Sequence, residues 1–118
     1  LIGFKKEIKL LKEELFEYYL KEEECKEFII KGLYLLSMED MKFLSHEYIE
    51  KGAKFVYLFN KEGGIINKDS SFPLNFKDLL EKLKRNFGVR GGGRDFLSIK
   101  TDKTLEIGEY LWNMIKSQ

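Results

Sequence analysis

Arginine and glycine gather in one short stretch of this chain, and both are residue types that suit phosphate binding. The chain has three arginines, Arg85, Arg90 and Arg94, and all of them lie within ten residues, although lysine is common throughout. Gly88 and Gly91 to Gly93 remove side chains from the same stretch, so that a bulky partner can approach the backbone. A guanidinium grips phosphate with a planar fork and stacks on bases. The stretch therefore predicts a surface for an anion or a nucleic acid.

A purely structural turn is the alternative. Gly88 follows a helical pattern and suits a helix C-cap, while Lys84 and Arg85 would offset the negative end of the helix dipole. Capping leaves Gly91 to Gly93 and the two arginines around them unexplained, which favours a binding surface. Residues 77–103 also carry eight basic and four acidic side chains in a chain of net charge +1. The predicted nucleic-acid-binding residues are Lys84, Arg85, Arg90, Gly91, Gly92, Gly93, Arg94 and Lys100.

Catalytic chemistry finds little support in the sequence. One histidine, His46, and one cysteine, Cys25, provide neither a zinc site, a disulfide framework nor a nucleophile with an adjacent base. The glycine stretch lacks the Gly-Lys-Ser/Thr ending of a P-loop, and it follows a helix and precedes a strand, which is the reverse of the P-loop order. We therefore expect a binding module without a cofactor, and not an enzyme by itself.

Length and composition point to one ordinary domain. The chain has 118 residues, of which 43% are hydrophobic and 35% charged, as is typical of globular proteins. It contains no apolar run near the length of a membrane span, and we expect no signal peptide. We expect a cytoplasmic protein that does not bind a membrane.

Two regions are expected. Residues 1–24 should form a long amphipathic helix that acts as a connector or a dimerisation element, or packs on the chain's own body. Residues 25–118 should form an α/β (α+β) domain, in which helices pack on a small mixed β-sheet. The seam of the first helix consists of Leu1, Phe4, Ile8, Leu11, Leu15 and Tyr18. Strands are expected at 26–36, 54–60, 65–66 and 96–100, and helices at 38–51, at 76–87 and from a cap at Thr101 or Asp102 to Ile115.

Local signals connect these elements. Ser37 should cap the helix at 38–51, Asn60 to Gly64 should form a hairpin turn, and the glycine stretch should form a loop between the helix at 76–87 and the last strand. His46 lies among the polar positions of its helix and is expected to be a surface residue.

This order of elements, with an Arg-Gly-Gly-Gly-Arg-Asp motif before the last strand, resembles the C-terminal domain of alanyl-tRNA synthetases. That domain belongs to the DHH-associated family, whose motif reads approximately Gly-Gly-Gly-Arg-Pro-Asp followed by Ala-Gln-x-Gly-Gly. Gly91 to Asp95 match its first half without the proline. Phe96 to Ile99 stand where Ala-Gln would fall, and Lys100 to Lys103 replace the second glycine pair.

The resemblance implies a tRNA-binding module, with alanine tRNA as the expected partner. Such a module contacts the outer corner of tRNA and couples aminoacylation to editing by other domains of a parent ligase. Two alternatives stay open. One is the substrate-binding domain of a DHH phosphoesterase acting on short oligonucleotides, in which a histidine usually follows the triple glycine where this chain has Arg94. The other is a protein-interaction or homodimerisation module that uses Leu1 to Tyr18.

Overall fold

A computed structural model describes Tyr18 and residues 26–116. Except for Tyr18, the helix expected at residues 1–24 lies outside the described residues. None of the described helices is long and apolar enough to cross a membrane. The elements are β1 (Phe28–Gly32), α2 (Met38–Glu50), β2 (Phe55–Phe59), β3 (Gly63–Lys68), α3 (Phe76–Phe87), β4 (Arg90–Gly92), β5 (Leu97–Lys100) and α4 (Thr104–Lys116).

The five strands form one mixed sheet in the order β1-β2-β3-β5-β4. Helix α2 connects β1 to β2, which run parallel, and the other three pairs are antiparallel. β2 and β3 occupy the centre, and almost every residue in them is buried. The sheet therefore has two chemically different edges, β1 and β4.

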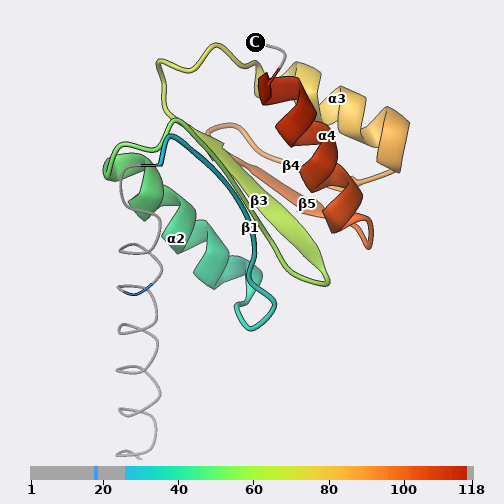
Figure 1. The fold of residues 1–118 in the computed structure, drawn as a ribbon. Helices are drawn as coiled ribbons and strands as arrows, with labels where there is room; N and C mark the ends of the chain where they lie inside the picture. Colours follow the sequence, from blue (N-terminus) through green and yellow to red (C-terminus); the bar gives the residue numbers. More distant parts are fainter. Residues whose placement is uncertain (1–17, 19–25, 117–118) are drawn as a thin grey trace, which may run out of the picture.

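Helices cover both faces of the sheet, as Figure 1 shows: α2 lies on one side, and α3 and α4 lie on the other. Alternate residues of a strand point to opposite faces, so β2 supplies both cores. Val56 and Leu58 pack with Met41 and Leu44 of α2. Phe55, Tyr57 and Phe59 pack with residues of α3 and α4, among them Leu83 and Leu111. The expected mixed sheet packed with helices is confirmed.

Side-chain caps begin two of the helices. Ser37 Oγ accepts a hydrogen bond from the Asp40 backbone N–H (3.1 Å) at the start of α2, as the sequence predicts. Asn75 Oδ1 accepts from the backbone N–H groups of Lys77 (2.9 Å) and Asp78 (3.3 Å) at the start of α3. These bonds satisfy amides that have no partner within the helix.

The turn from β2 to β3 is built around a buried asparagine. Asn60 Oδ1 accepts hydrogen bonds from the backbone N–H groups of Glu62 (2.8 Å) and Gly63 (3.2 Å). Its Nδ2 donates to the Leu36 carbonyl (2.8 Å), which ties the loop after β1 to this turn. The predicted hairpin turn at Asn60 to Gly64 is confirmed, and β3 extends well beyond the predicted pair Ile65-Ile66.

A buried tyrosine ties α4 to the centre of the sheet. The Tyr57 hydroxyl is fully buried and donates a hydrogen bond to the Thr104 carbonyl (3.0 Å) in the first turn of α4. Burial is the main reason that the pKa of Tyr57 is raised far above its usual value, because the phenolate would lose its hydration. The neutral hydroxyl therefore remains a donor and fixes where α4 begins.

The stretch after α3 differs from its prediction. It was expected to be a connecting loop, but Arg90–Gly92 forms a fifth strand, β4, antiparallel to β5. Gly88 does end α3 as predicted, with a left-handed φ of 66° and its N–H donating to the Lys84 carbonyl (3.0 Å). β1 is also shorter than predicted, since Tyr34 and Leu35 form an exposed turn.

Candidate nucleic-acid interface

The predicted site residues lie mainly on the hairpin formed by β4 and β5. The hairpin pairs Arg90 with Lys100, Gly91 with Ile99 and Gly92 with Ser98. On its other side β5 pairs with β3, so β4 forms an edge of the sheet. Residues 93–96 turn the chain between the two strands. The expected binding stretch is therefore held on a sheet and is not a free loop.

Two cations face each other at the open end of the hairpin. Arg90 and Lys100 are directly opposite in the register, and both side chains are exposed. The Cβ atoms of directly opposed residues lie about 5 Å apart, and like charges at that spacing destabilise a strand pair. A bound anion would turn this repulsion into attraction, so the pair is suited to holding a phosphate group.

The backbone of the hairpin explains two of the three consecutive glycines. Gly91 has a φ of 132°, and a Cβ added there would lie 2.0 Å from the Ser98 carbonyl oxygen. At Gly93, φ is 157° and a Cβ would lie 1.8 Å from the Phe96 carbonyl oxygen. Neither position accepts a side chain, with or without a partner. Part of the glycine signal in the sequence therefore reports the shape of the hairpin itself.

Gly92 differs from its two neighbours. A Cβ added there would meet Leu80 Cδ2 at 3.7 Å, which is ordinary van der Waals contact. Its φ does not lie in the range that disfavours a side chain. Hairpin geometry therefore permits a larger residue at Gly92, and the bare backbone there is free to serve another purpose.

Lys84 and Arg85 occupy the last turn of α3, one short connector before β4. Both are exposed, and both lie where a positive charge interacts favourably with the C-terminal end of the helix dipole. The buried Val89 anchors the connector that leads to Arg90. The sequence therefore places these two cations on the side of the hairpin where Arg90 begins β4.

Arg94 lies in the turn at the opposite end of the hairpin from Arg90 and Lys100. The five predicted cations are all exposed, and none forms an ion pair with any residue in the described part of the chain. They thus form two groups, one toward each end of the β4–β5 hairpin. Lys84, Arg85, Arg90 and Lys100 belong to the open end, and Arg94 belongs to the turn.

Sequence reasoning did not associate α2 with this edge. Phe96, at the end of the hairpin turn, contacts two residues of α2: Lys42 Nζ lies 4.9 Å from the centre of its ring, and the His46 ring meets it edge to face at 5.6 Å. His46 was expected to be a surface residue, and it is exposed. The four-residue spacing of Lys42 and His46 was the available signal, but many solvated helices have it.

Neither a scan against protein-family models nor a search of curated proteins finds a match for this chain.

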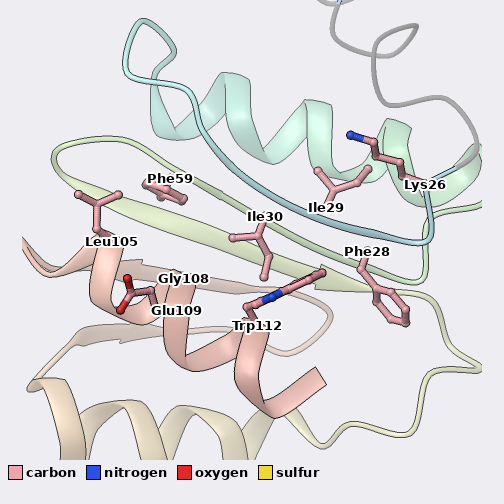
Figure 2. A pocket seen from close by; sticks show the side chains of 9 residues that line it. All are labelled: Lys26, Phe28, Ile29, Ile30, Phe59, Leu105, Gly108, Glu109 and Trp112. Atoms are coloured by element: carbon pink, nitrogen blue, oxygen red, sulfur yellow. The ribbon is translucent and has the colours of Figure 1, made fainter. Parts of the chain in front are cut away.

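A hollow lies at the other edge of the sheet, between β1 and α4. It has a volume of about 410 Å³ and is lined mainly by apolar side chains. Figure 2 shows Trp112 extending from α4 toward Ile30 and Phe28 of β1. Within the described residues, histidine, cysteine, aspartate and glutamate form no group able to hold a metal ion. The exposed cations of the β4–β5 hairpin make it the stronger candidate for a nucleic-acid site.

Proposed function

We propose that this chain is a tRNA-binding module, comparable to the C-terminal domain of alanyl-tRNA synthetases that its motif resembles. It would contact the outer corner of tRNA, with alanine tRNA as the expected partner, and hold it for other domains of a parent ligase. The observation that carries the proposal is the exposed pair formed by Arg90 on the edge strand β4 and Lys100 opposite it on β5, with Arg94 at the other end of the same hairpin. The phosphate groups of a polyanion would neutralise the positive charges of these three side chains.

The surface suits binding to a phosphate backbone rather than reading of bases. Arg90 on the short edge strand β4 and Lys100 on the neighbouring β5 can contact successive phosphates, while the backbone at Gly92 adds no side chain that would reach a base edge. Affinity should then depend on the shape of the RNA and on salt. This behaviour fits a module that grips a folded tRNA.

Titrations with alanine tRNA, a non-cognate tRNA and a short single-stranded oligonucleotide, each at two salt concentrations, test the proposal. We expect both tRNAs to bind more tightly than the oligonucleotide, with affinity falling steeply as salt rises. Tightest binding of the short oligonucleotide would instead support the substrate-binding domain of a DHH phosphoesterase. Failure of all three to bind would reject RNA binding and favour the interaction module.

A further inference from the structure

His46 is held by a buried network that the proposed function does not use. Asn67 is buried, with 3% of its surface exposed, and it lies on β3 beneath α2. Its Oδ1 accepts a hydrogen bond from the Lys68 backbone N–H (2.8 Å), and this bond fixes which end of the amide is oxygen. The Nδ2 end therefore faces Ser45 Oγ (3.4 Å) and His46 Nδ1 (3.1 Å).

These bonds determine the tautomer of the neutral histidine. Asn67 Nδ2 is a donor only, so His46 Nδ1 must accept and cannot carry a proton. The proton of the neutral ring is then on Nε2, on the far side of the ring from Asn67. Ser45 fits the same pattern, because its hydroxyl donates to the Lys42 carbonyl (2.8 Å) and leaves its oxygen to accept. The buried Asn67 thus holds the exposed ring of His46, and the Nε2–H donor of that ring is directed away from Asn67.

Lys42 lies one helical turn before His46, and both contact the ring of Phe96. Lys42 is exposed and makes no ion pair with any described residue, although Glu39 lies one turn before it on α2. Phe96 ends the hairpin turn that carries Arg94 and Asp95. Two donors of α2 therefore lie next to the end of the hairpin that is far from Arg90.

We propose that the RNA-binding surface continues from the hairpin onto α2, where Lys42 Nζ and His46 Nε2 hold a further phosphate of the same RNA. This inference rests on the proposed function. Phe96 acts as a positioning residue, since its ring supports the ammonium of Lys42 on one side and the imidazole of His46 on another. The RNA backbone would then run from Arg90 and Lys100, past Arg94, to α2.

A purely structural role for His46, as a partner of the buried Asn67, accounts for only part of this arrangement. A buried asparagine needs partners, and Ser45 and His46 satisfy its amide. That need does not explain a lysine placed over the ring that His46 also contacts, at the end of a cationic hairpin. The test must therefore separate binding from support of Asn67.

The double variant Lys42→Gln/His46→Gln tests the proposal in tRNA titrations over a range of salt. We expect about fivefold weaker binding at moderate salt, and a slope of affinity against salt that is shallower by about 1 because one phosphate contact is lost. Lys51→Gln is the matched control, since it removes one positive charge at the C-terminal end of the same helix. It should leave the affinity within about twofold of the wild type and the slope of affinity against salt unchanged.

Nitrogen NMR of the His46 ring tests the contact directly. If His46 only supported Asn67, the signals of its ring nitrogens would not change when tRNA is added. In the free protein we expect the Nε2-protonated tautomer, and on addition of tRNA we expect the Nε2 signal to shift more than the Nδ1 signal. Unchanged affinity and an unmoved Nε2 signal, in a chain whose affinity does fall on Arg90→Gln/Arg94→Gln, would overturn the α2 contact alone. A wild-type chain that binds no tRNA would overturn both proposals.

Discussion

The two edges of the sheet are built on opposite principles. At the β4 edge no strand residue is fully buried, two glycines are required by the neighbouring backbone, and the exposed side chains are cations. At the β1 edge Ile29 is buried, Phe28 and Ile30 are half-buried, and α4 closes an apolar groove with Trp112. One edge is held by main-chain geometry and the other by side-chain packing. Stability and binding should therefore respond differently to substitutions at the two edges.

Gly91→Ala should have the largest effect. We expect it to lower the free energy of unfolding by about 3 kcal/mol, because the added methyl group meets the Ser98 carbonyl and φ is unfavourable for alanine. Urea denaturation measures the loss. Gly92→Ala is the matched control, since it adds the same methyl group one residue later and should stay within about 0.5 kcal/mol of the wild type. Equal stabilities of the two variants would contradict the close approach of Gly91 to the Ser98 carbonyl.

Ile30→Ala tests the other edge. Ile30 packs against the core shared with α4, so its truncation should lower the free energy of unfolding by about 2 kcal/mol, less than for a fully buried site. Affinity for tRNA, measured well below the unfolding transition, should not change. A variant of normal stability with weak tRNA binding would show that the β1 edge contacts RNA, and the contrast between the edges would fail.

Arg90→Gln/Arg94→Gln should act on binding and spare the fold. Loss of two phosphate contacts should weaken tRNA binding about tenfold, or about 1.4 kcal/mol, and make the salt slope shallower by about 2. Lys26→Gln/Lys54→Gln removes the same charge near the β1 edge, where Lys54 lies 3.9 Å from Glu27, and should bind nearly as the wild type does. Equal weakening by both pairs would mean that net charge, and not the hairpin, governs affinity.

Trp112→Ala should have the smallest effect of the four. The indole is 43% exposed, so its removal should cost less than about 1 kcal/mol of stability. Binding to tRNA should stay within about twofold of the wild type in the same titration. A large loss of affinity here would move the candidate interface to the groove.

Hydrophobic periodicity and turn chemistry were sufficient to predict the centre of the fold. The unbroken apolar run from Phe55 to Phe59 predicted the strand β2, and the spacing from Phe76 to Phe87 predicted α3. The cap at Ser37 and the end at Gly88 followed from local hydrogen bonding and from the left-handed backbone that glycine favours. These features depend on short-range chemistry that the sequence displays directly.

β4 could not be predicted in the same way. Arg90, Gly91 and Gly92 have no apolar alternation and include two residues that disfavour strands. The strand exists because β5 offers a free edge and because Gly91 adopts a φ that other residues avoid. Sequence spacing identified the cations of the hairpin because they are close in the chain. It could not connect them with Lys42 and His46, which only the packing of α2 beside Phe96 brings near.

The way in which β4 is attached has a consequence for the dynamics of the protein. Its register connects it to β5 alone, and Arg90, Gly91 and Gly92 bury no side chain in either core. Local opening of this strand therefore disrupts few interactions, and its amide protons should exchange with solvent much sooner than those of β2. A polyanion lying along the strand would slow that exchange, so its arrival should be visible as newly protected amides at the outermost strand before any change at the centre of the sheet.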